Sequence, residues 1–167
     1  MSSLRSLIFL KRRFQAMPLD RPEDEHVEIR PGVAGVVRNG AGEILLHRRP
    51  ASNGWAPPSG TMEPEEDVRS ALNRELQEET ALSVKIERLV GIYSDPTFQI
   101  VRYPDGSSVH FVTTLFDCSV HSGRLQGSDE GSAWGWFAPG ALPNPLLPYT
   151  RKWIQDTLDE HTDPRVE

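Results

Sequence analysis

The sequence predicts one α/β (α+β) domain, an α/β/α sandwich built on a mixed, partly antiparallel sheet. Three observations support this class. The chain has 167 residues, which suits one domain with a single core. Strand-like and helix-like segments follow one another in the order strands, helix, strands, helix. No internal repeat and no linker divides them, so the elements should pack as layers around one sheet.

The first strands and the first helix are expected from local patterns. Residues 33–38 and 43–48 are apolar runs on either side of an Asn39-Gly40 turn signal, which predicts a β-hairpin. Residues 50–60 contain Asn-Gly and Pro-Pro pairs, which predict a loop. A helix is predicted over residues 65–80. Its first turn would hold Pro64 and the acidic residues Glu63, Glu65, Glu66 and Asp67.

The second half of the chain completes the layers. Apolar and β-branched runs predict strands over residues 84–93, 109–120 and 134–137. A closing helix is expected over residues 149–160. Residues 31–163 would form the domain, and residues 1–30 an N-terminal extension. The extension is either an arm that joins two copies in a homodimer or contacts a membrane surface, or a tail or helix that belongs to its own domain.

The composition excludes several classes of protein. The formal net charge is −6, whereas proteins that grip long nucleic acids by their phosphates are usually basic. No run approaches the ~20 apolar residues of a transmembrane helix. The single cysteine, Cys118, forms no disulfide within the chain and lies in an apolar stretch typical of a core. We therefore expect a cytoplasmic protein with neither a long nucleic acid nor a membrane as partner.

The negative charge is concentrated in residues 60–82. This stretch holds seven acidic and two basic residues, a net charge of −5 against −6 for the whole chain. Glu75, Glu78 and Glu79 are spaced i, i+3, i+4, so on a helix they project on one side. That side is apolar one turn earlier, where a core-facing stripe would lie. Two interpretations remain open: a divalent-cation site, or an exposed acidic helix paired with Arg69 and Arg74.

The same residues resemble the Nudix box, written G-x5-E-x7-R-E-U-x-E-E-x-G-U, where U is a bulky aliphatic residue. Gly60 begins the match, Glu66 follows after five residues, and residues 74–82 complete it after seven more. Every defined position matches except Ala81, where the pattern has glycine. A glycine there would be a left-handed helix cap, so Ala81 carries a modest conformational penalty. Ser59 stands where many members have a second glycine.

The resemblance implies a Nudix hydrolase that uses Mg²⁺, or alternatively Mn²⁺, to cleave a phosphoanhydride bond. It implies Glu75 and Glu79 as the leading metal ligands, with Glu78 and the Gly60 carbonyl next. Water would attack a phosphorus atom in line with the leaving group, and a glutamate would accept its proton. The candidate catalytic residues are Glu78, Glu130 and Arg74.

Further roles follow from the same resemblance. Arg74 would orient the carboxylates, and Glu66 would bind a second metal ion or pair with Arg74. An acidic residue from a distant loop would act as ligand or general base. Glu130 is the candidate for it and Asp129 the runner-up, and a solvated loop acid is the alternative interpretation of Glu130.

The substrate is the least determined feature. Residues 93–96 and 103–106 resemble a subgroup called ADP-ribose pyrophosphatase-like. A small nucleotide is therefore expected as partner, with ADP-ribose or another nucleoside diphosphate derivative first and a nucleoside triphosphate second. A nucleotide-sensing domain without turnover is the alternative of a different class. The candidate substrate-binding residues are two cations for phosphates and four aromatic residues that could stack on a base or lie in the core: Arg48, Arg49, Trp55, Tyr93, Phe98 and Tyr103.

Overall fold

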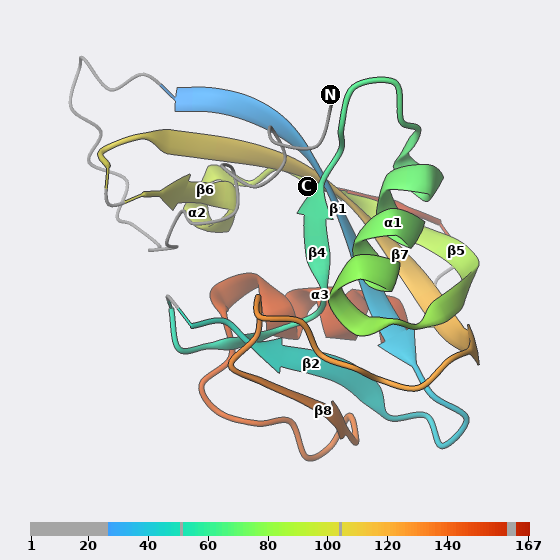
Figure 1. Ribbon diagram of the computed structural model, residues 1–167. Helices are drawn as coiled ribbons and strands as arrows, with labels where there is room; N and C mark the ends of the chain where they lie inside the picture. Colours follow the sequence, from blue (N-terminus) through green and yellow to red (C-terminus); the bar gives the residue numbers. More distant parts are fainter. Residues whose placement is uncertain (1–26, 51, 104, 160–162) are drawn as a thin grey trace, which may run out of the picture.

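The computed structural model describes residues 27–50, 52–103, 105–159 and 163–167. Over these residues a large mixed sheet carries helices on its two faces (Figure 1), which confirms the predicted class. The helices are α1 (Val68–Thr80), α2 (Pro96–Gln99) and α3 (Pro148–Leu158). The strands are β1 (Val27–Arg38), β2 (Ile44–Arg48), β3 (Trp55–Ala56), β4 (Ser59–Thr61), β5 (Ser83–Tyr93), β6 (Ile100–Arg102), β7 (Ser108–Ser122), β8 (Ala133–Phe137) and β9 (Arg165–Val166).

The sheet is ordered β3-β2-β1-β7-β5-β9, and β4, β6 and β8 pair at its sides with β1, β7 and β2. β1 and β7 are parallel, while β5 runs antiparallel to β7. The short strand β4 pairs antiparallel with β1, and Val33 is opposite Gly60. This pairing holds Gly60, the first residue of the acidic stretch 60–82, next to the central strand β1 and directly beside α1 (Figure 1).

Two cores form because successive side chains of a strand point to opposite faces of the sheet. Val33 and Val37 of β1 pack toward Leu72 and the rest of the α1 face. Ala34 and Val36, between them in sequence, pack toward Trp153 and the rest of the α3 face. The sheet is therefore covered on both sides, as the sandwich prediction required, and α1 is held rigidly by its apolar residues.

The start of α1 differs from the prediction. Asp67 is the N-cap, and its carboxylate accepts hydrogen bonds from the backbone N–H groups of Arg69 at 2.8 Å and Ser70 at 2.9 Å. Glu65 has a φ of 70°, which is outside right-handed helical geometry. The prediction that Pro64 and the acidic residues at positions 63 and 65–67 form the first turn is therefore wrong, because α1 begins at Val68 and the stronger capping signal of aspartate sets the boundary.

The end of α1 agrees with the prediction, whereas several short elements were not predicted. α1 ends at Thr80 as predicted, and Ala81 has the left-handed φ of 57° expected of the cap. Residues 50–60, predicted as a loop, contain β3 and β4, and the segment after β5 contains α2 and β6. β1 begins at Val27, inside the predicted extension, because its first residues pair with β7. β9 lies beyond the predicted end of the domain and pairs with β5.

Two further predictions concern single features. Cys118 is buried in the core under α1, as expected. Among the residues that the structure describes, no helix is both long and apolar enough to cross a membrane. The predicted extension up to residue 26 lies outside the described residues.

Candidate active site

The three helix carboxylates differ in exposure. Glu79 is 1% exposed, whereas the side chain of Glu75 is 14% exposed and that of Glu78 is 63% exposed. One helical side carries all three, as the spacing predicts, but only the carboxylates of Glu75 and Glu79 lie within the fold. Glu78 is at the rim, where Arg74 contacts it at 3.4 Å.

Arg74 joins three parts of the site. Its guanidinium donates two hydrogen bonds to Glu66, from Nε at 2.6 Å and from Nη2 at 2.9 Å. It also donates to the Thr61 carbonyl of β4 at 3.0 Å and to Glu75 Oε1 at 3.0 Å. This pairing lowers the pKa of Glu66 to about 2. Of the two roles expected for Glu66, the structure shows the ion pair with Arg74, which fixes the loop before α1.

Gly60 leaves room for Glu75. A Cβ atom at Gly60 would lie 2.0 Å from the carboxyl carbon of Glu75 and 2.3 Å from both of its oxygens. The carboxylate thus lies directly against β4, where the Thr61 N–H donates to it at 3.2 Å. Burial raises the pKa of Glu75, and the charge of Arg74 opposes this rise. The first glycine of the box thus leaves the space that the carboxylate occupies, and a side chain there would displace Glu75 from β4.

Glu79 is the least compensated group in the site. Neither carboxylate oxygen forms a hydrogen bond with any described residue. Burial raises the pKa of Glu79 well above its usual range, and the nearby Glu130 and Glu75 carboxyls raise it further. The Arg49 guanidinium opposes that rise, and it donates to Ser59 Oγ at 2.6 Å. Ser59, where many members have glycine, thus holds Arg49 next to the carboxylates.

Glu130 reaches this centre from the loop between β7 and β8. The Ser128 N–H donates to the Glu79 carbonyl at 2.9 Å, and the Gln126 N–H donates to the Thr80 carbonyl at 2.9 Å. These bonds attach the loop to the last turn of α1. Glu130 is partly buried and Asp129 is exposed, so the geometry favours Glu130 as the distant acid.

The donors present suit a hard divalent cation. The described residues include no group of three histidine, cysteine or acidic side chains already gathered at metal-binding distances. They do include a buried carboxylate without partners, Glu79, and two further carboxylates near enough to shift its pKa, Glu75 and Glu130. Oxygen donors of this kind are the ligands of Mg²⁺ and Mn²⁺. The arrangement fits such an ion, because its charge would offset the burial of Glu79.

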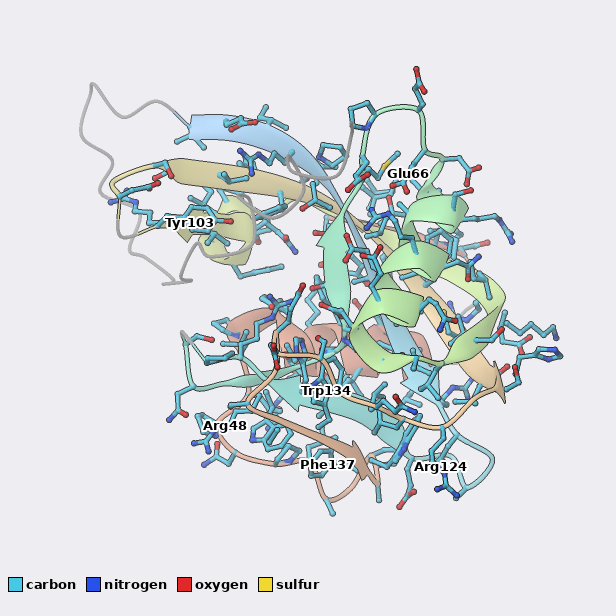
Figure 2. All side chains as sticks on the ribbon, in the orientation of Figure 1. Arg48, Glu66, Tyr103, Arg124, Trp134 and Phe137 are labelled. Carbon is cyan, nitrogen blue, oxygen red and sulfur yellow. The ribbon has the colours of Figure 1, made fainter. Side chains whose placement is uncertain are left out.

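The candidate substrate residues are placed differently from one another. Arg48 is partly buried at the C-terminal end of β2, labelled in Figure 2, and its Nε donates to the Asn53 carbonyl at 3.4 Å. Trp55 packs edge-on against Phe137 with ring centroids 5.0 Å apart. Tyr103 lies beside α2 and β6, and Figure 2 shows it on the opposite side of the molecule from Glu66. Of the two predicted phosphate-binding cations, only Arg49 is close enough to the carboxylates to affect a pKa there.

Phe98 and Tyr93 both pack into one core cluster, Tyr93 as a buried member and Phe98 partly buried against it. Phe98 lines a small hollow of about 30 Å³ together with Tyr149 of α3, and the other lining residues are mostly apolar. Base stacking by Phe98 stays a prediction. Tyr93 is 0% exposed, and its hydroxyl donates to Asp156 at 2.8 Å. The prediction that Tyr93 stacks on a base is wrong, because the core covers both faces of its ring.

Sequence reasoning missed two residues near the site. His47 of β2 is fully buried and stacks on Trp134 of β8, with ring centroids 4.5 Å apart. Trp134 in turn donates its indole N–H to the Ser128 carbonyl at 3.3 Å. No motif marks either residue, because their contact depends on the pairing of β2 with β8.

Comparison with known proteins gives one family. A family model described as "NUDIX domain" matches residues 28–157. A solved MutT NUDIX hydrolase from Burkholderia pseudomallei has a similar fold, with a TM-score of 0.64 and 27% identity, covering 77% of this chain and 98% of that one.

Three curated relatives carry different substrate names. An ADP-ribose pyrophosphatase from Methanocaldococcus jannaschii is 32% identical over 119 residues, 69% of this chain and 66% of that protein. A putative 8-oxo-dGTP diphosphatase from Bacillus subtilis is 29% identical over 136 residues, 81% and 84% of the two chains. An RNA pyrophosphohydrolase from Dinoroseobacter shibae is 30% identical over 145 residues, 78% and 90%.

Proposed function

Because the chain belongs to the Nudix family and is a Nudix pyrophosphohydrolase, we propose that it cleaves a phosphoanhydride bond in a nucleoside diphosphate joined to a second group. ADP-ribose is the favoured substrate. The observation that carries this proposal is Glu79, a buried carboxylate with no hydrogen-bond partner among the described residues, beside Glu75 and Glu130. An uncompensated acid of this kind costs stability, and cation-dependent hydrolysis gives it a use.

The proposed cation is Mg²⁺, with Mn²⁺ as the alternative. Glu75 and Glu79 would hold it, with the Gly60 carbonyl and Glu130 nearby and Glu78 at the rim. When bound, the cation supplies positive charge for the phosphate oxygens and lowers the pKa of a water molecule. Arg74 keeps Glu75 turned toward β4 by the hydrogen bonds described above, so this ligand is oriented before substrate arrives.

Side chains of this protein are proposed to carry out proton transfer and substrate binding during the hydrolysis. Water forms a new bond to phosphorus, the anhydride P–O bond breaks, and the leaving phosphate keeps the bonding electron pair. Glu130 accepts the proton of the water, since it is the acid that the loop brings to Glu79. Arg49 binds a phosphate oxygen, and Ser59 holds its guanidinium in place. Phe98, which is only partly buried, is the proposed aromatic contact for the nucleoside.

The named relatives and the net charge bear on the choice among substrates. The relative named ADP-ribose pyrophosphatase supports a nucleoside diphosphate derivative. The relative named putative 8-oxo-dGTP diphosphatase supports the second candidate, a nucleoside triphosphate. The net charge of −6 argues against a long RNA substrate, although one relative is named for RNA.

A substrate panel tests the proposal. The wild-type chain and Glu79→Gln are incubated with Mg²⁺ and, separately, ADP-ribose, a sugar nucleotide, a dinucleoside polyphosphate, nucleoside triphosphates and 5′-triphosphorylated RNA. We expect nucleoside monophosphate to be released fastest from ADP-ribose by the wild type, and turnover by the variant to be at least a hundredfold slower. Turnover of no member would support the nucleotide-sensing alternative. Equal turnover by the variant would contradict the assignment of the site.

A further inference from the structure

The loop that carries Glu130 is folded around one indole ring. A Cβ atom at Gly127 would lie 2.0 Å from Cδ1 of Trp134, and one at Gly131 would lie 2.6 Å from its Nε1. Neither position can hold a side chain while the ring stays in place. The main chain on both sides of Glu130 therefore lies directly on Trp134, which Figure 2 shows on β8 beneath the C-terminal end of α1.

Ser128 connects the ring to the helix. Its carbonyl accepts the indole N–H of Trp134 at 3.3 Å and the Gly131 N–H at 3.3 Å. Its own N–H donates to the Glu79 carbonyl at 2.9 Å, and its hydroxyl accepts the Glu130 N–H at 3.3 Å. One residue thus links Trp134, the last turn of α1 and the backbone of Glu130.

The imidazole ring of His47 stacks on one face of the indole. Its ring is 0% exposed and stacks on Trp134 with an interplanar angle of 25°. Neither ring nitrogen has a hydrogen-bond partner among the described residues. Burial lowers the pKa of His47 to about 2, so the ring is uncharged at neutral pH. A neutral ring that forms no hydrogen bonds contributes packing, and here it fixes the plane of the indole.

We propose that Trp134, supported by His47, is a positioning residue that holds Glu130 beside Glu79. It acts through Ser128 and needs no contact with substrate. This inference rests on the proposed function for the role of Glu130, but the placement of the loop does not depend on it.

Amide hydrogen exchange tests the placement without any activity. Trp134→Phe removes the indole N–H donor and keeps an aromatic ring against His47. We expect the Ser128 and Gly131 amides to exchange at least tenfold faster in this variant. Trp136→Phe, two residues along the same strand, is the matched control and should leave both amides unchanged. Unchanged exchange in Trp134→Phe, or equal acceleration by both variants, would overturn the proposal.

A double-variant cycle tests the functional consequence on whichever substrate the panel identifies. Trp134→Phe should lower kcat about tenfold with KM unchanged, since small misplacement of a catalytic group is costly. Combined with Glu130→Gln, it should add nothing to the loss caused by Glu130→Gln alone. Losses that multiply would show that Trp134 does not act through Glu130. If no panel member is hydrolysed, the proposed function fails, and the exchange measurement still decides the placement.

The role of His47 has its own comparison. His47→Phe keeps a flat ring and should retain wild-type exchange at Ser128, whereas His47→Ala should accelerate it as Trp134→Phe does. Equal acceleration by both His47 variants would show that the imidazole is needed for more than stacking.

Discussion

Replacing Glu79 by glutamine should make the metal-free protein more stable while it slows hydrolysis at least a hundredfold. The carboxylate is 1% exposed, and its oxygens have no hydrogen-bond partner among the described residues. At neutral pH the folded chain must therefore either bury the charged carboxylate or keep Glu79 protonated, although an exposed glutamate would be ionised at this pH. Glutamine has nearly the same shape and carries no charge, so it avoids both costs.

The sign and size of the effect follow from the burial. In the unfolded chain Glu79 ionises near its ordinary pKa of 4.5, and in the folded chain burial raises that pKa. Between the two values the folded state binds more protons, so its stability falls as pH rises. The cost of burying a neutral polar group is the same for glutamine and cancels in the comparison. What the substitution removes is the cost of charging the acid or of keeping its proton, about 1.4 kcal/mol for each pH unit above the ordinary pKa, up to the pKa of the folded chain. At pH 8 we expect Glu79→Gln to be more stable by at least ~1–3 kcal/mol, and each kcal/mol raises the Tm of a chain of this size by roughly 2–4 °C.

Thermal and urea unfolding with EDTA, at pH 8 and pH 5, measure this difference. The stabilisation should be largest at pH 8 and should shrink toward pH 5. Glu78→Gln is the matched control one residue away, because the Glu78 side chain is 63% exposed, and its stability should stay within about 0.5 kcal/mol of the wild type. A Glu79→Gln protein less stable than the wild type at pH 8, or a difference that does not change with pH, would refute the reasoning.

Three further predictions concern the surroundings of Glu79. Gly60→Ala should lower kcat/KM at least tenfold because its Cβ displaces Glu75, whereas Gly40→Ala, with open space around it, should match the wild type in steady-state kinetics. Arg74→Lys should lower kcat/KM at least tenfold in the same assay, since lysine lacks the two-pronged donor that holds Glu66 and Glu75. The pH profile of kcat/KM between pH 5 and 8 should show no inflection that His47→Phe removes, because the pKa of His47 is about 2; a lost inflection would contradict this.

The sequence predicts the chemistry of the site because its key signals are local. Helical spacing puts Glu75, Glu78 and Glu79 on one side of α1, and the resemblance to the Nudix box adds their expected role as metal ligands. Ala81 adopts the left-handed conformation that its position in the box requires. The start of α1 was harder to predict, since Pro64 and Asp67 both favour a helix N-terminus. Aspartate decides the boundary, because its carboxylate bonds to two backbone N–H groups.

Features that depend on tertiary contacts were not predictable in the same way. Tyr93 and Phe98 both follow patterns that allow a core or a binding role, and the structure shows Tyr93 fully buried and Phe98 partly buried against the same core cluster. The contact of His47 with Trp134 joins residues far apart in the chain through one strand pairing. The homodimer, the cytoplasmic location and the role of the N-terminal extension stay predictions.

Calorimetric titration of Mg²⁺ into the wild-type chain and into Glu79→Gln tests the central claim most directly, namely that the buried carboxylate exists to hold a divalent cation. We predict saturable binding to the wild type, with an affinity at least tenfold weaker or no detectable heat for the variant. Equal affinity of the two proteins for Mg²⁺ would contradict the claim.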